Sequence, residues 1–210
     1  MEKSSYTGTV VLADGDFPRH ATPLGYLKNA TRIICCDGAA KALVGAGYEP
    51  AAIVGDCDSI DETLSARYAG RIFRIDDQET NDLTKAVRWC AERKIRDLVI
   101  LGGTGKREDH TLGNISLLAE YAHFVNVRMV TDAGVFYPVL ESTTFRSVQG
   151  QQVSVFSIDP GMEITSSDLK YPLKKMKLTN WWQATLNEAT AESFRLEFKG
   201  GALIVFMAFV

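Results

Sequence analysis

The stretch 97–110 reads DLVILGGTGKREDH, and it joins an apolar run to a glycine-rich turn and the start of a helix. Residues 97–101 have the length and character of a buried strand, and glycines at 102, 103 and 105 follow at once. From about Glu108 to His123, apolar residues recur at helical spacing. A strand that runs through such a turn into a helix is typical of a parallel sheet, so the stretch favours an α/β fold.

The same alternation extends over the first two thirds of the chain. A second helical pattern spans Asn81–Lys94. Further apolar, strand-like runs are Thr9–Ala13, Arg32–Cys36, Ala51–Val54, Arg71–Ile75 and Val125–Val130. We therefore expect an α/β N-terminal domain over residues 1–135, with a mostly parallel sheet flanked by helices.

The pattern changes near residue 133, after which no convincing helix is visible. Short β-rich runs alternate with turn signals such as Asp-Pro and Gly-Gly. These runs are Phe136–Leu140, Thr143–Ser147, Gln152–Ile158, Ala184–Leu186, Ser193–Phe198 and Ala202–Val210. They predict an all-β C-terminal sandwich over residues 140–210.

Composition bounds the class of protein. The chain has 210 residues and a net charge of −3 without a basic block, so we expect no nucleic-acid partner. The stretch Met1–Val10 lacks the features of a signal peptide, and no apolar run is long enough to span a bilayer. The sequence therefore predicts a cytoplasmic protein without a membrane partner.

Polar residues gather where the predicted strands end. Such signals follow four strands, at Asp37-Gly38, Gly55–Ser59, Asp76–Gln78 and Gly102–Arg107. In an open parallel sheet, ligands bind beyond the carboxyl ends of the strands. We expect the four segments to converge on one edge of the sheet.

Three aspartates are candidates for a metal site. Asp56 and Asp58 are two residues apart, so an extended chain would place both carboxylates on one face. Asp82 and Lys85 lie three apart near the start of a helix for which Thr80 is a plausible N-cap. Carboxylates together with substrate phosphates are the usual ligands of Mg²⁺, which is the cofactor we expect.

The glycine-rich segment is a candidate phosphate site. Free backbone N–H groups at the start of a helix attract anions, and Arg107 could make paired contacts with phosphate oxygens. The segment is neither a Walker A loop nor a GxGxxG motif.

Four motifs in order resemble those of the thiamine pyrophosphokinase family. They are CDGAA at 36–40, GDCDS at 55–59, DQETNDLTKA at 77–86 and GGTGKREDHTLGN at 102–114. The resemblance implies an α/β catalytic domain, a β-sandwich domain that binds thiamine, and a homodimer with active sites between its subunits. It also implies transfer of pyrophosphate from ATP to thiamine.

The resemblance assigns roles by position. Asp56, Asp58 and Asp82 correspond to the residues that handle the metal and the pyrophosphate. The implied ATP-binding residues are Asp37, Asp77, Gln78, Lys85, Gly102, Gly103, Thr104, Arg107, Asp109, His110 and Asn114. On the thiamine side the implied residues are Ser167, Tyr171 and Asn187.

The chain departs from the family pattern at three positions. Asn81 stands where the family commonly has Ser or Thr, and Lys106 stands where it commonly has a second Gly. Leu186 replaces a serine before Asn187, so the thiamine side of the chain departs from the family pattern. Trp181 and Trp182 suit either a ligand surface or the core of the sandwich.

The implied reaction is attack of the thiamine hydroxyl on the β-phosphorus of ATP, with AMP as the leaving group. Asp58, Asp82 and Asp109 are candidates to accept the hydroxyl proton. Three alternatives remain: a pyrophosphokinase for another alcohol such as a hydroxymethyl pterin, a non-catalytic thiamine-binding protein, and a phosphatase-like hydrolase with Asp56 as its nucleophile.

Overall fold

The structure is a computed structural model, and it describes residues 7–210. The N-terminal stretch for which no signal peptide is expected therefore lies mostly outside the described residues. The chain folds into two compact units, residues 7–117 with 124–132, and residues 118–123 with 133–210. Among the described residues, no helix has the length and apolar character that crossing a membrane requires.

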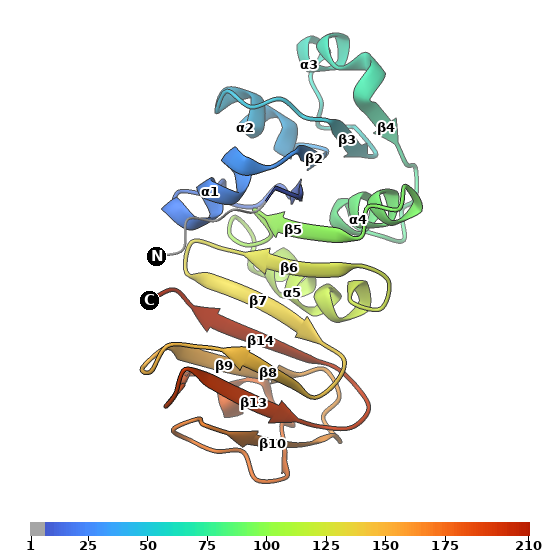
Figure 1. The fold of residues 1–210 in the computed structure, drawn as a ribbon. Helices are drawn as coiled ribbons and strands as arrows, with labels where there is room; N and C mark the ends of the chain where they lie inside the picture. Colours follow the sequence, from blue (N-terminus) through green and yellow to red (C-terminus); the bar gives the residue numbers. More distant parts are fainter. Residues whose placement is uncertain (1–6) are drawn as a thin grey trace. The chain divides into compact units, whose positions relative to one another are not determined.

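The first unit contains a parallel sheet in the order β6-β5-β1-β2-β3-β4 (Figure 1). Its strands are β1 Thr9–Leu12, β2 Arg32–Cys36, β3 Ala52–Gly55, β4 Ile72–Arg74, β5 Asp97–Leu101 and β6 Asn126–Val130. Residues such as Val10, Ile53 and Ile100 are fully buried, because a parallel sheet inside an α/β unit is covered on its faces. The predicted α/β class is confirmed.

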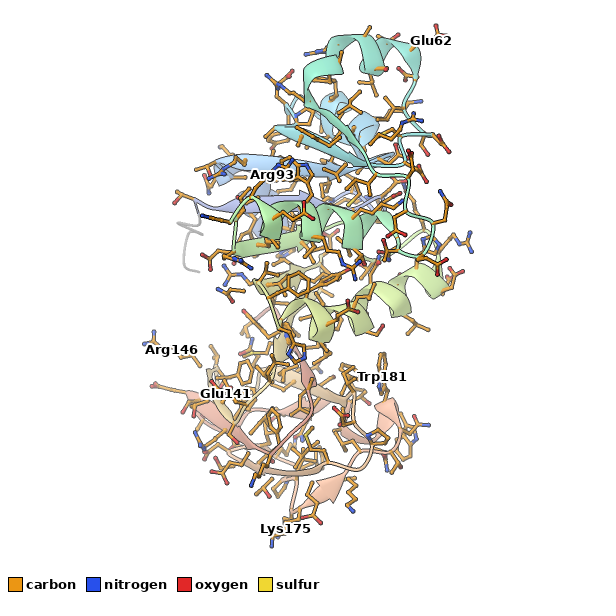
Figure 2. All side chains as sticks on the ribbon, turned by 90° about the vertical axis from the view of Figure 1, so that its right-hand side faces the viewer. Glu62, Arg93, Glu141, Arg146, Lys175 and Trp181 are labelled. Atoms are coloured by element: carbon orange, nitrogen blue, oxygen red, sulfur yellow. The ribbon has the colours of Figure 1, made fainter. Side chains whose placement is uncertain are left out.

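Helices alternate with these strands. They are α1 Ala21–Asn29, α2 Ala39–Gly45, α3 Glu62–Arg67, the 3₁₀ turn η1 Ala69–Arg71, α4 Asp82–Glu92 and α5 Glu108–Tyr121. The α4 helix packs against β1, β2 and β3. Its buried face includes Leu83, Ala86, Val87 and Cys90, as the helical spacing predicts. The exposed Glu62 lies in the first turn of α3, at the top of the view in Figure 2.

The second unit is a two-sheet β structure. Its sheets have the antiparallel orders β12-β9-β14-β7 and β11-β10-β13-β8. The elements are β7 Gly134–Val139, β8 Thr143–Arg146, β9 Gln152–Ser157, β10 Glu163–Ser167, β11 Met176–Lys177, η2 Trp181–Ala184, β12 Asn187–Glu188, β13 Ser193–Glu197 and β14 Leu203–Ala208. Buried side chains from both sheets, including Val155, Phe194 and Val205, share one core. The predicted C-terminal sandwich is confirmed.

One predicted strand is wrong. Residues 184–186 do not form a strand, because the chain makes the 3₁₀ turn η2 and then passes through Leu186 with φ 55°. Asn180 caps this turn by accepting a hydrogen bond from the Trp182 N–H, and the Gln183 side chain accepts one from the Asn180 N–H. Pairing resumes at β12. The strands β10 and β11 have no counterpart in the sequence prediction.

Candidate active site

The candidate site lies at the carboxyl ends of β1 and β5, where the strand order reverses. From β1 the chain proceeds through β2, β3 and β4 in one direction, and β5 then pairs with the other side of β1. Such a switch point is where open α/β sheets bind ligands. Two loops meet there, since the Gly15 N–H donates to Gly102 O at 2.8 Å and the Asp16 N–H donates to Thr104 O at 2.8 Å.

The close approach of these loops requires glycine. A Cβ on Gly15 would stand 2.2 Å from Thr104 O and 2.4 Å from Gly102 O. Gly102 itself has φ +63°. Any side chain at Gly15 would therefore push the two loops apart.

Three carboxylates converge beside this point. Asp37 follows β2, Asp56 follows β3, and Asp82 is the first residue of α4. One carboxylate oxygen from each lies within 4.8 Å of the others. We call these three residues the acidic cluster.

Asp37 is the buried member of the cluster. Its side chain accepts a hydrogen bond from the Ser59 N–H at 3.3 Å, but its Oδ1 is buried without a hydrogen-bond partner among the described residues. Burial raises the pKa of Asp37, the bond from Ser59 lowers it in part, and the charges of Asp82 and Asp56 raise it further.

This donor set fits a hard divalent cation. It consists of carboxylate oxygens, which are the ligands that Mg²⁺ and similar ions use. A cation would also give the buried Oδ1 of Asp37 the partner that protein atoms do not supply.

Lys85 supplies positive charge to the cluster. Its side chain is 4% exposed, and its Nζ lies 3.0 Å from Asp82 Oδ1 and 3.8 Å from Asp56 Oδ2. Burial alone would lower the pKa of Lys85, but the hydrogen bond with Asp82 and the charge of Asp56 outweigh it, so the pKa is raised. The predicted proximity of Asp82 and Lys85 on one helical side is what the structure shows.

The expected geometry of Asp56 and Asp58 is wrong. The strand β3 ends at Gly55, and Cys57 has φ 65°, so the chain is not extended between the two aspartates. The Asp58 N–H turns back to donate to Asp56 Oδ1 at 3.3 Å, and Asp58 is exposed outside the acidic cluster. Asp37 takes the third place in the cluster. A role for Asp58 in metal binding stays a prediction.

The N-cap of α4 is Asn81 rather than Thr80. The Asn81 Oδ1 accepts a hydrogen bond from the Thr84 N–H at 2.9 Å. Its amide nitrogen donates to Asn114 Oδ1 at 3.1 Å, and Asn114 in turn donates to Gly103 O at 2.9 Å. Thr80 instead donates to Asp77. The hydrogen bonds from Thr80 and from the Glu79 N–H lower the pKa of Asp77.

Arg107 and Asp109 form a forked ion pair at the start of α5. Arg107 Nε donates to Asp109 Oδ1 at 3.0 Å, and Nη2 donates to Oδ2 at 2.5 Å. These bonds lower the pKa of Asp109 to about 2. The guanidinium expected to contact phosphate is thus engaged with a carboxylate in this structure.

A pocket of about 400 Å³ connects these groups within the first unit. Of the residues that the sequence predicts, it is lined by Asp56, Asp77, Gln78, Asp82, Lys85, Gly103, Arg107, His110 and Asn114. Asp37, Asp58, Gly102, Thr104 and Asp109 are not in its lining. The lining also contains Asp14, Gly15 and Cys36, which the site prediction leaves out, and Lys106, which stands where the family commonly has a second Gly. Asp14 and Gly15 follow the end of β1, so the rule that placed the other residues applies to them as well.

The predicted thiamine-side residues lie in the second unit. Asn187 is buried, and its side chain accepts from the Tyr171 N–H at 3.0 Å and donates to Tyr171 O at 2.7 Å. This amide therefore holds the backbone of Tyr171, whose side chain is 63% exposed. Ser167 is exposed at the end of β10.

The two tryptophans have different surroundings. Trp181, labelled in Figure 2, donates from Nε1 to Ser157 O at 3.2 Å, and its ring packs against Phe156. Trp182 is 70% exposed and Leu186 is 71% exposed. Trp181 thus belongs to the packed structure of the second unit, whereas Trp182 and Leu186 lie on its surface.

Both units match families of known proteins. The profile of the thiamin pyrophosphokinase catalytic domain matches residues 24–131, and that of the thiamin pyrophosphokinase substrate-binding domain matches residues 134–206. A thiamine pyrophosphokinase of Bacillus subtilis is 28% identical over 173 residues, which are 77% of this chain and 80% of that protein. Thiamin pyrophosphokinase 1 of Caenorhabditis elegans is 33% identical over 90 residues, and the match spans only 37% of that protein.

The fold has solved counterparts. The crystal structure of the thiamine pyrophosphokinase from Bacillus subtilis superposes with a TM-score of 0.77 over 95% of this chain and 98% of that chain, at 23% identity. The fold is therefore shared over nearly the whole chain.

Proposed function

The chain belongs to the thiamin pyrophosphokinase family, and from this premise we propose that it transfers pyrophosphate from ATP to thiamine, giving thiamine diphosphate and AMP. The observation that carries the proposal is the acidic cluster with Lys85 beside a glycine-rich loop, at the switch point of the sheet. This arrangement suits a polyphosphate bound together with a divalent cation.

The proposed cofactor is Mg²⁺, held by Asp56, Asp82 and the buried Oδ1 of Asp37, with Asp58 as a further candidate. Such an ion neutralises charge on phosphate oxygens and orients the group that is transferred. The orphaned oxygen of Asp37 and the purely carboxylate donor set support this assignment.

The protein side chains supply position and charge. Lys85, fixed by Asp82, presents an ammonium group beside the cluster, where it can stabilise the negative charge of the transferred group. The loop from Gly102 to Arg107 is held by Gly15 and Asn114, so its backbone is in place before the nucleotide binds. Asp77, Gln78, Thr104 and His110 are proposed to contact the nucleotide around this frame.

Asp109 is the least suitable of the three candidates for the proton acceptor. A carboxylate whose pKa is held at about 2 is a poor base near neutral pH, which argues against Asp109. Asp58 and Asp82 remain as candidates to accept the proton of the thiamine hydroxyl.

The second unit is proposed to bind thiamine. The match to the substrate-binding domain supports this, as do the exposed Tyr171, Trp182 and Leu186, which offer aromatic and apolar surface to a heterocycle. Ser167 and Asn187 are proposed to shape or contact that surface. We also propose a homodimer, which light scattering after size-exclusion chromatography would test. The cytoplasmic location and the lack of nucleic-acid and membrane partners stay predictions.

The relatives described above are all named thiamine pyrophosphokinases, and none supports the pterin, sensor or hydrolase alternatives. One experiment tests the proposal directly. The protein is incubated with ATP, Mg²⁺ and thiamine, and the nucleotide product is identified. AMP that forms only when thiamine is present is the expected result. ADP, free phosphate or no product would contradict the proposal, as would AMP formation with a hydroxymethyl pterin but not with thiamine.

A further inference from the structure

An ion pair in the wall of the pocket joins the loops that follow β1 and β5. Lys106 Nζ lies 2.8 Å from Asp14 Oδ1, and both side chains are 51% exposed. Both residues line the 400 Å³ pocket. The site as proposed above assigns neither of them a role.

The backbone at Lys106 is held in a conformation that lysine does not favour. Its φ is 57°, after Gly105 with φ 83°. The Gly105 N–H donates to Thr111 Oγ1 at 3.1 Å, and the Arg107 N–H donates to Gly105 O at 2.7 Å, so the turn is fixed on both sides. A left-handed conformation is unfavourable for a residue other than glycine.

The ion pair does not account for a lysine at this position. Exposed pairs of this kind contribute little to stability. That contribution does no more than offset the cost of the left-handed backbone, which glycine would avoid. The ion pair therefore does not explain why a lysine stands at position 106. The position of its ammonium group in the pocket wall suggests that it binds a ligand.

Lys106 is the most easily released of the basic groups in this pocket. Among the described residues, Lys85, Lys106 and Arg107 are the basic side chains that line it, leaving histidine aside. Lys85 is buried and paired with two carboxylates, and Arg107 is forked onto both oxygens of Asp109. Lys106 has a single exposed carboxylate partner, which water and a phosphate can replace at little cost.

We propose that Lys106 is a phosphate-binding residue of the nucleotide pocket, which Asp14 holds in the free protein and releases when a polyphosphate binds. The inference rests on the proposed function. The flexible four-carbon stem lets the ammonium move while the turn stays fixed. A polyphosphate carries several negative charges, so it attracts the ammonium more strongly than one exposed carboxylate does.

The test is direct binding measured by calorimetry, with ATP and with inorganic tripolyphosphate as separate probes. Lys106→Gly is expected to weaken both ligands about tenfold, because one charged hydrogen bond is lost and the residue contacts phosphate rather than the base. Asp14→Asn is expected to bind both ligands at least as tightly as the wild type, because it frees Lys106. Equal weakening by both substitutions would show that the pair only supports the loop, and would overturn the inference.

The variants are chosen so that folding does not confuse the result. Glycine suits the φ of Lys106, so Lys106→Gly is expected to melt no lower than the wild type. Lys94→Gly is a matched control, since Lys94 also has positive φ at 61° and directly follows the C-cap of α4, outside the pocket lining. It is expected to leave binding unchanged, and an equal loss in this control would overturn the inference.

Failure of this inference is distinguishable from failure of the proposed function. If the wild type binds neither ATP nor tripolyphosphate, the proposed function fails. If the wild type binds both and Lys106→Gly binds them equally well, only the role of Lys106 is overturned.

Discussion

The ammonium of Lys85 lies 3.0 Å from a carboxylate oxygen of Asp82, one turn earlier in the same helix, and the lysine side chain is 4% exposed. Asp56 Oδ2 lies 3.8 Å from the same ammonium group. The positive charge of Lys85 balances the negative charges of Asp56 and Asp82, which would otherwise repel each other. The pair therefore bears on stability as well as on ligand binding.

We expect Lys85→Met to lower stability by about 2 kcal/mol. Breaking a buried ion pair costs about 3–5 kcal/mol, but the two carboxylates remain about one third exposed to water, which reduces the effect. Urea unfolding of the variant measures the loss. The control is Lys41→Met, because Lys41 is exposed on α2 and its replacement is expected to change stability little. Similar losses for both variants would contradict this account.

The composition of the acidic cluster predicts which aspartate substitutions affect turnover and the Mg²⁺ requirement most. Asp37→Asn and Asp82→Asn are expected to lower turnover by about 100-fold or more and to raise the Mg²⁺ concentration needed for half-maximal rate. Asp58→Asn is expected to have a smaller effect on that concentration, because Asp58 lies outside the cluster. Initial rates at varied Mg²⁺ give both quantities. A larger shift for Asp58→Asn than for Asp37→Asn would place Asp58 rather than Asp37 on the metal.

Gly55 has no side chain, and this leaves the space that Asp37 and Asp82 of the acidic cluster occupy. A Cβ at this position would stand 2.9 Å from the Asp37 Cβ and 3.1 Å from Asp82 Oδ1. Gly55→Ala is therefore expected to move these carboxylates and reduce turnover by about tenfold or more, since small misplacements at a reacting centre have large effects. Gly25→Ala is the control, because Gly25 lies within α1 with nothing within 4 Å of the added atom. Alanine there is expected to raise stability by about 0.5–1 kcal/mol and to leave turnover unchanged, as a urea titration and rate measurements would show.

The ion pair between Arg107 and Asp109 leads to a prediction for the pKa of Asp109. In the wild type the carboxyl of Asp109 is expected to titrate at about 2, and in Arg107→Gln its pKa is expected to rise toward the ordinary value of 3.8. Because the folded pKa lies below the unfolded one, the contribution of the pair is complete at neutral pH and is lost as pH falls through the range from about 4 to 2. NMR of the side-chain carboxyl carbon measures this directly. An unchanged pKa in the variant would mean that the His110 N–H, which also donates to Asp109, sets the value.

The sequence predicts most of the site because the rule for parallel sheets uses strand ends alone. Asp37, Asp56 and the glycine-rich loop fall at the carboxyl ends of strands that apolar runs identify. The position of Asp58 could not be found in this way. It depends on the left-handed φ of Cys57, which no pattern of residue types in the sequence indicates.

The errors in the second unit have a similar origin. The strand β10 has the sequence EITSS, with one strongly apolar residue, so it gives little alternation to detect. The apolar pattern predicts a strand at residues 184–186, but the capping interactions of Asn180 and Gln183 stabilise a 3₁₀ turn that includes Ala184. The first strand offers little apolar pattern to detect, and in the second case local polar contacts decide the structure.

The place of β1 in the sheet has a consequence for how the protein acquires its pocket during synthesis. Val10 pairs with Ile33 on one side and with Val99 on the other, although β2, β3 and β4 come before β5 in the chain. Contacts between distant segments form late, because the chain between them must first be ordered. A nascent chain whose β5 has not yet left the ribosome contains Asp37, Asp56 and Asp82 but lacks the strand that leads into the glycine-rich loop. We therefore expect the pocket to be complete only once β5 has paired with β1, late in the folding of the first unit.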